Sequence, residues 1–238
     1  MYKTPAETTS FFETFRPLVA SVEHREIVIF PSFTNLAAAV EATQGTRIRI
    51  GAQNIAWAKE GAFTGEVSGP MIVATGATYT IVGHSERRQY FGETDETVLK
   101  RTLAALEFGL TPIICVGEHL KERESGNTEF VLSRQFQKGI AGLSKQQFAR
   151  IAISYEPLWA IGTGKAATPE IAARAHRVIR AEAKASFGRE AAAAIRILYG
   201  GSVKPDNVRS LMAQEEIDGV LVGGASLDAV SFASIVNF

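Results

Sequence analysis

A carboxylate stands at the end of an apolar run in the second half of the chain. Residues 153–155 have the character of a buried strand, and Glu156 follows directly after them. Gly162 and Gly164 then mark the loop that comes next. In α/β barrel enzymes a general base commonly stands at the carboxyl end of a strand, at the opening of the barrel, where a mobile loop can cover it. Taken alone, Glu156 could equally be a solvated loop acid.

A histidine, His84, offers the complementary chemistry. It ends a predicted strand, and Ser85 and Glu86 can open a helical turn directly after it. A helix N-terminus disfavours a second positive charge, so we expect a neutral imidazole that can donate to a carbonyl oxygen. By itself His84 could be a core or surface histidine. Its position before Ser-Glu-Arg-Arg, with Glu156 downstream, favours a catalytic role.

Two glycine pairs follow the last two predicted strands. Gly200 and Gly201 precede Ser202, and the second pair is Gly223 and Gly224. Loops at the ends of the last strands of a barrel commonly bind phosphate through backbone amides. Either pair alone could be an ordinary tight turn. Together they predict a phosphate grip that needs no lysine or arginine.

Four segments, taken in chain order, carry a resemblance to a known family. They are VGHSERR at 82–88, YEPLWAIGTGK at 155–165, LYGGSV at 198–203 and GVLVGGAS at 219–226. This pattern closely resembles the triosephosphate isomerase family, and the resemblance covers nearly the whole chain. It implies an α/β protein with the (β/α)8 TIM-barrel fold that interconverts dihydroxyacetone phosphate and D-glyceraldehyde 3-phosphate through an enediolate.

The resemblance also implies the roles of individual residues. Glu156 would be the base and His84 the electrophile, with no metal and no cofactor. The substrate phosphate would be bound by the backbone at Gly162, Ser202, Gly223 and Gly224. Glu86 and Glu118 match family positions too, but a structural ion-pair role is at least as compatible with each of them.

The resemblance fails at the amino terminus. The family's first strand ends in Asn-x-Lys, whose ammonium lies against the substrate, whereas here the similarity starts one residue later, at Met1. Lys3 is not the equivalent lysine, because it stands beside Thr4, the expected N-cap of the first helix. We therefore expect seven strands in this chain, and a natural protein that begins upstream with the missing strand. The alternative is a catalytically impaired, phosphate-binding remnant of the enzyme.

Length and composition agree with one barrel domain over residues 1–238. No linker or low-complexity tract divides the 238 residues, and one α/β barrel takes about 250. With 25 basic and 25 acidic residues the net charge is zero, which argues against a nucleic-acid or membrane surface. The start lacks the apolar segment of a signal peptide. The single Cys115 permits no internal disulfide, so we expect a buried core thiol and a cytoplasmic location.

Short apolar runs alternate with amphipathic helices, which predicts a parallel sheet. The expected strands are residues 26–30, 47–53, 79–83, 112–116, 151–155, 195–199 and 220–222. Thr4 and Glu7 form a capping box that starts the first helix, and Pro17 should end or bend it. Thr94 should cap a helix whose inward face includes Val98 and Leu103.

A polar, glycine-containing segment at residues 54–68 is longer than most loops in compact domains. Its sequence around Phe63 resembles the interdigitating loop of the family, which docks into a neighbouring subunit beside the active site. An aromatic residue exposed on a monomer would be an unusual arrangement. We therefore expect a homodimer formed through this loop.

Overall fold

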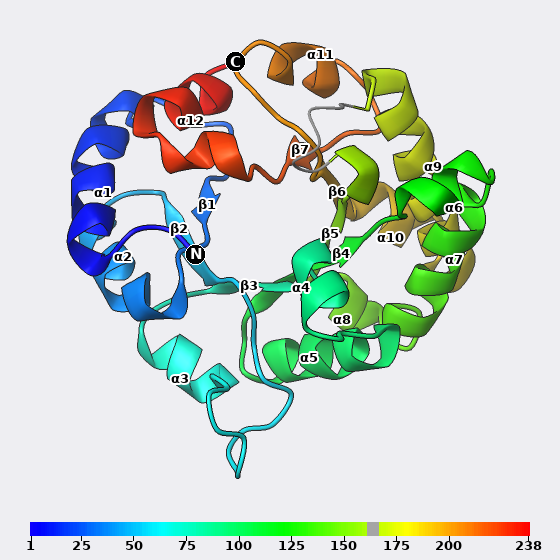
Figure 1. Ribbon diagram of the computed structural model, residues 1–238, viewed down its shortest axis with the longest axis horizontal. Coiled ribbons are helices and arrows are strands. Elements are labelled where there is room, and N and C mark those ends of the chain that lie inside the picture. Colours follow the sequence, from blue (N-terminus) through cyan, green and yellow to red (C-terminus); the bar gives the residue numbers. More distant parts are fainter. Residues whose placement is uncertain (161–166) are drawn as a thin grey trace.

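The sheet of the computed structural model, which describes residues 1–160 and 167–238, contains seven parallel strands in sequential order. The strands are β1 (Val28–Ile29), β2 (Arg49–Ala52), β3 (Tyr79–Val82), β4 (Thr111–Val116), β5 (Ala152–Tyr155), β6 (Arg196–Tyr199) and β7 (Gly219–Val220). The sheet curls around a central axis, with helices forming an outer ring (Figure 1). Seven parallel strands at the predicted places confirm the α/β barrel architecture, and β1 and β7 are the two ends of the strand order.

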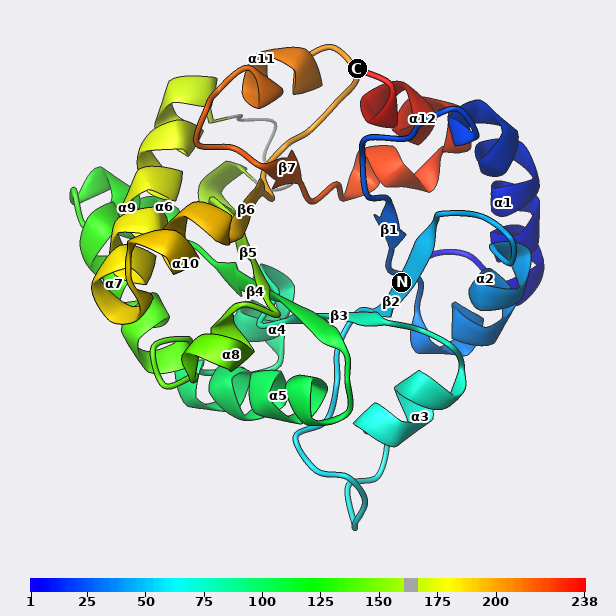
Figure 2. The same ribbon diagram turned by 180° about the vertical axis from the view of Figure 1, so that it is seen from behind.

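Helices connect the successive strands and cover the outside of the sheet, as both views show (Figure 2). Those of the first half are α1 (Pro5–Val19), α2 (Leu36–Ala42), α3 (Gly69–Ala74), α4 (Ser85–Tyr90), α5 (Asp95–Glu107) and α6 (Leu120–Glu124). Those of the second half are α7 (Thr128–Gly139), α8 (Lys145–Phe148), α9 (Pro169–Phe187), α10 (Arg189–Ala194), α11 (Val208–Met212) and α12 (Ala229–Val236). The described part of the chain also contains short 3-10 turns at Phe33–Asn35, Leu158–Ala160 and Gly224–Leu227.

Strand register brings the predicted site residues to one rim of the sheet. Val82 pairs with Ile114, Val116 with Tyr155, and Tyr155 with Tyr199. Parallel strands present their carboxyl ends at the same edge. The residues that follow β3, β5 and β6 therefore share that edge.

The first helix begins as predicted, and of the two effects expected of Pro17, an end or a bend, the end does not occur at that residue. The capping box is present, because the Thr4 side chain accepts from the Glu7 N–H and the Glu7 carboxylate accepts from the Thr4 N–H. Pro17, however, lies inside α1 and does not end it. Proline removes one backbone hydrogen bond near the last turn. Packing compensates, since the Phe15 ring stacks on Phe232 of α12 with centroids 5.1 Å apart.

The inward face of α5 was also predicted incorrectly at one position. Leu103 is exposed, whereas Val98, Arg101 and Thr102 are buried. The sequence pattern assigned polar residues to solvent, so it rotated the expected face toward Leu103. Arg101 is buried because its guanidinium has acceptors there: the Asn54 side chain, the Ile55 carbonyl and the Glu66 carboxylate.

Apolar packing between the sheet and the helical ring forms the core. Phe148 stacks on Phe187 with ring centroids 4.0 Å apart, and both rings lie near Phe136 of α7. Cys115 is buried in β4, as predicted. None of the helices described, in residues 1–160 and 167–238, is long and apolar enough to cross a membrane.

His176 of α9 is a fully buried histidine on the outer side of β5. Its Nδ1 lies 3.0 Å from the Glu216 carbonyl oxygen, and its ring meets the Tyr155 ring edge-on. Burial lowers the pKa of His176 from 6.5 to about 4, opposed by the Glu216 carbonyl and the nearby Asp218. The unfolded chain therefore binds a proton on this residue at higher pH than the folded protein does.

We expect His176 to make the protein less stable as the pH falls from 7 to 5. Above pH 6.5 both states carry a neutral ring. Below it the unfolded state gains a proton first, which lowers the free energy of unfolding by about 2 kcal/mol at pH 5. Urea unfolding at one fixed protein concentration measures this change. His176→Gln should flatten the dependence, and the same substitution at exposed His24 should not. Equal slopes for all three proteins would contradict the assignment.

Candidate active site

Glu156 follows β5 directly, and its buried carboxylate is held at the rim of the sheet. Its backbone N–H donates to the Val116 carbonyl at 2.7 Å, which extends the β4–β5 pairing by one step. The carboxylate Oε2 accepts a hydrogen bond from the Ser85 backbone N–H at 2.8 Å. The other oxygen, Oε1, lies 3.4 Å from Nε2 of His84. The structure thus brings the predicted base and the predicted electrophile into direct contact.

His84 is the N-cap residue of α4, and its ring is fixed by that helix start. Nδ1 accepts a hydrogen bond from the Glu86 backbone N–H at 3.3 Å. A ring nitrogen that accepts a hydrogen bond carries no proton, so this geometry suits the neutral tautomer with its proton on Nε2. Nε2 faces the Glu156 carboxylate, and a bound carbonyl oxygen could replace that carboxylate as its acceptor. The Glu86 side chain is largely exposed and only approaches His84, at 3.9 Å.

Gly200 packs closely against the Glu156 side chain. An added Cβ on Gly200 would lie 2.8 Å from Cγ of Glu156 and 2.6 Å from the hydroxyl of Ser154. Both distances are shorter than real side-chain contacts, so only glycine fits at position 200 without displacing its neighbours. Burial, and then the charge of the Glu156 carboxylate, raise the pKa of the Cys115 thiol. The carboxylate therefore sits between glycine, a neutral thiol and the His84 ring.

Glu118, which the sequence left open between a catalytic and a structural role, is fully buried. Its Oε1 accepts hydrogen bonds from the Tyr155 hydroxyl at 3.1 Å and from the Trp159 indole at 2.9 Å. Arg123 lies 3.7 Å from the same oxygen, and its guanidinium stacks over the Trp159 ring. Burial and the Glu118 charge raise the pKa of Tyr155. These contacts connect Glu118 to the residues on both sides of Glu156.

The predicted phosphate grip occupies the loops after β6 and β7. Ser202 is partly exposed, and the Asn207 side chain donates to its carbonyl at 3.0 Å. Gly223 caps the 3-10 turn Gly224–Leu227, and an added Cβ at Gly223 or Gly224 would meet no atom within 4 Å. An anion can therefore approach the backbone at both glycines. Gly162, together with the other loop positions from 161 to 166, lies outside the described residues.

Lys3 contacts the first helix and the 3-10 turn at Phe33–Asn35. Its ammonium lies 5.2 Å from the centroid of the Phe11 ring on α1, and its carbonyl accepts from the buried Asn35 amide at 2.7 Å. In residues 1–160 and 167–238 no cluster of three or more histidine, cysteine or acidic side chains could hold a metal ion.

Two contacts of the site were missed by the sequence interpretation. The Ser85 N–H orients the Glu156 carboxylate, although Ser85 was considered only as the start of a helical turn. Gly117 lies against the Glu156 backbone, and an added Cβ there would be 1.8 Å from the Glu156 carbonyl oxygen. The glycine immediately before Glu118 was the one available signal for this close approach, since glycine often marks a point where two backbones meet.

Comparisons with known proteins cover the chain from end to end. The family model described as "Triosephosphate isomerase" matches residues 1–238. A triosephosphate isomerase of Solibacter usitatus is 74% identical over 238 residues, spanning 100% of this chain and 96% of the relative. The triosephosphate isomerases of Citrifermentans bemidjiense and Moorella thermoacetica are 53% and 54% identical, each over 100% of this chain and 95% of the relative.

Proposed function

Because the chain belongs to the triosephosphate isomerase family, we propose that Glu156 and His84 together carry out its isomerisation chemistry. The reaction of this family is the interconversion of dihydroxyacetone phosphate and D-glyceraldehyde 3-phosphate, and the chain has that isomerase function. The observation that carries the residue roles is the 3.4 Å contact between Glu156 Oε1 and His84 Nε2 at the rim of the barrel. A base and a hydrogen-bond donor so close together can act on adjacent atoms of one small substrate.

Glu156 would act first, by removing a proton from the substrate carbon beside the carbonyl. The electrons of that C–H bond form the carbon–carbon double bond of an enediolate, and negative charge develops on the former carbonyl oxygen. The protonated carboxyl of Glu156 then returns the proton to the neighbouring carbon. Atoms and charge balance, because the same carboxylate accepts and donates one proton.

His84 would stabilise the developing charge. Its Nε2–H can donate to the carbonyl oxygen and then pass a proton between the two enediolate oxygens. The hydrogen bond from the Glu86 N–H fixes the tautomer that this step needs. A donor that is already aimed at the developing oxyanion requires no reorganisation during the reaction.

The phosphate of the substrate would be held by backbone amides at Ser202, Gly223 and Gly224, and at Gly162 in the loop after Glu156. Ser202 lies two residues beyond Gly200, and Gly200 packs against the Glu156 side chain. The phosphate end and the reacting end of a triose phosphate can therefore bind side by side. Glycine at three of these positions allows the backbone to approach the phosphate closely.

The non-catalytic alternative, a remnant that only binds phosphate, is less well supported. An identity of 74% over the whole chain and an intact Glu156–His84 pair favour the isomerase. A coupled assay with glyceraldehyde 3-phosphate, run beside a titration with a phosphate-bearing enediolate analogue, tests this. Turnover together with analogue binding supports the isomerase, and analogue binding without turnover supports the remnant. The buried free thiol of Cys115 suits the reducing cytoplasm, where we place the enzyme.

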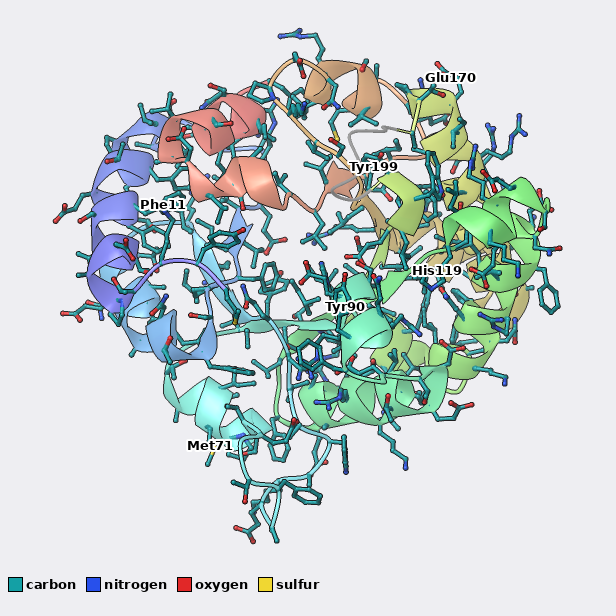
Figure 3. All side chains as sticks on the ribbon, viewed as in Figure 1. Phe11, Met71, Tyr90, His119, Glu170 and Tyr199 are labelled. Atoms are coloured by element: carbon teal, nitrogen blue, oxygen red, sulfur yellow. The ribbon has the colours of Figure 1, made fainter. Side chains whose placement is uncertain are left out.

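We also propose that the segment at residues 54–68 forms a homodimer interface. This segment projects from the body of the barrel next to α3 (Figure 1). At its tip the rings of Trp57 and Phe63 pack edge-on with centroids 5.8 Å apart, and each residue is 42% exposed. Met71 of α3 and Tyr90 of α4, both labelled in Figure 3, are exposed as well.

Arg101 holds this segment in shape for docking. It donates to the Glu66 carboxylate at 3.1 Å, and its guanidinium lies 4.9 Å from the Trp57 ring centroid. A second acid, Glu93, lies 3.3 Å from Nε of Arg101. A loop that is already ordered loses little entropy on binding, so it suits a permanent self-association.

We expect the protein to sediment as a dimer and Phe63→Ala to weaken it strongly. Burying a phenylalanine contributes about 2 kcal/mol, and a symmetric interface contains the residue twice. The dimer dissociation constant should therefore rise by roughly 1000-fold. Sedimentation equilibrium measures it, with Phe130→Ala of α7, another exposed phenylalanine, as the matched control. A stable and fully active monomer of the unchanged protein would contradict this interface.

A further inference from the structure

Gln135 is a buried side chain of α7 to which the isomerisation chemistry assigns no role. Its Oε1 accepts a hydrogen bond from the Gly117 N–H at 2.8 Å, and its Nε2 donates to the Gly117 carbonyl oxygen at 2.9 Å. Both bonds are buried, where an unsatisfied polar group would be costly. A side-chain amide that makes two bonds with one residue fixes both the position and the orientation of that residue.

Gly117 is the middle of a short segment, residues 116–118, which we call the backing segment because residues 156–158 lie directly against it. The Glu156 N–H donates to the Val116 carbonyl at 2.7 Å, and the Leu158 N–H donates to the Glu118 carbonyl at 3.1 Å. Between these two bonds the Gly117 Cα faces the Glu156 carbonyl so closely that an added Cβ would lie 1.8 Å from its oxygen.

These contacts form a continuous line from α7 to the catalytic base. The backing segment begins at Val116, the last paired residue of β4, and residues 156–158 directly follow Tyr155, the last paired residue of β5. The N–H and the carbonyl group of Gly117 are both bound by the Gln135 side chain. Because Gly117 and Glu156 are in tight contact, movement of the backing segment away from α7 or toward it changes the place of the Glu156 backbone.

We propose that Gln135 is a positioning residue of the isomerase: it holds the backing segment so that the Glu156 carboxylate stays aligned with the substrate carbon. This inference rests on the proposed role of Glu156 as the base. A general base acts over a hydrogen-bond distance, and an ångström-scale displacement can reduce the rate by about 10²-fold. The two hydrogen bonds of Gln135 join it to Gly117 rather than to the proposed phosphate loops after β6 and β7, so substrate binding should change little.

Two substitutions test this proposal in steady-state assays. Gln135→Met keeps the approximate length of the side chain but removes both hydrogen bonds to Gly117. Gln135→Glu keeps an acceptor for the Gly117 N–H but turns an oxygen toward the Gly117 carbonyl. We expect each variant to lower kcat by about 10-fold or more and to change KM by less than about twofold.

Two control variants separate positioning from general stability. Gln137→Met is the same substitution at an exposed residue of α7 that donates to Glu182, and it should leave kcat and KM unchanged. Phe148→Leu removes packing against Phe187 and should lower the thermal midpoint with little effect on kcat. A kcat for Gln135→Met within twofold of the unchanged protein overturns the proposal. The proposal is also overturned if Phe148→Leu and Gln135→Met have the same thermal midpoint and lose the same amount of kcat.

If Gln135→Met does not fold, Gln135→Glu decides by the same criteria, since it keeps one of the two bonds. The unchanged protein is measured in the same assay. This measurement distinguishes a failure of the isomerase assignment from a failure of the role proposed for Gln135. An inactive unchanged protein would overturn the isomerase assignment and the role of Gln135 together. An active protein whose kcat is unaffected by both substitutions would overturn only the role of Gln135.

Discussion

Replacing Glu156 by aspartate will lower kcat by about 100-fold or more, while KM and the thermal midpoint stay close to those of the unchanged protein. The substitution keeps the carboxylate but shortens its side chain by one methylene. The base is then too far from the substrate carbon, and misplacement of this size can cost about 10²-fold in rate. The backbone bond from Glu156 to Val116 remains, so the fold is not affected.

Steady-state kinetics in both directions measure this loss, and transfer of deuterium from heavy water into the product reports the proton-transfer step itself. Glu13→Asp, the same chemical change on the exposed face of α1, is the matched control and should not alter either quantity. A kcat for Glu156→Asp within threefold of the unchanged protein would remove Glu156 from the mechanism. A lower thermal midpoint that accounts for the lost activity would do the same.

Most of the fold could be predicted from the sequence because strand and helix periods are local signals. The apolar runs at residues 112–116 and 151–155 correspond closely to β4 (Thr111–Val116) and β5 (Ala152–Tyr155). The Thr4 capping box was visible for the same reason, since Thr and Glu three residues apart are enough to define it. An error arose where tertiary packing overrode the local pattern, as on α5, where Arg101 is buried and Leu103 is exposed.

The close approach of Glu156 and His84 could be predicted because both residues stand in long, specific motifs at strand ends. The supports of that pair could not. Gln135 and Gly117 are 18 residues apart on different elements, and a glutamine on an amphipathic helix has the pattern of a solvent-facing residue. Arg101 was assigned no role for the same reason. Such contacts depend on which helix face meets which loop, and no spacing rule in one sequence records that.

Replacing His84 by glutamine will lower kcat by roughly 10²- to 10³-fold, the second large effect that the site predicts. Glutamine retains a side-chain N–H that can donate to a carbonyl oxygen. It cannot release that proton and take up another, so the relay between the two enediolate oxygens is lost. KM should change less than kcat, because the phosphate end of the substrate binds to other loops. Steady-state kinetics test this, with His24→Gln as the control at an exposed position.

The hydrogen bond from the Glu86 N–H to His84 Nδ1 adds a pH criterion to the same experiment. A neutral ring that donates from Nε2 does not need a second proton. An imidazolium donor would instead lose activity as the pH rises, because it would release its second proton. We therefore expect kcat of the unchanged protein to be at least as high at pH 8 as at pH 7. A fall in kcat over that interval, absent in His84→Gln, would show that the ring acts as a cation and that the tautomer fixed by Glu86 is not the catalytic one.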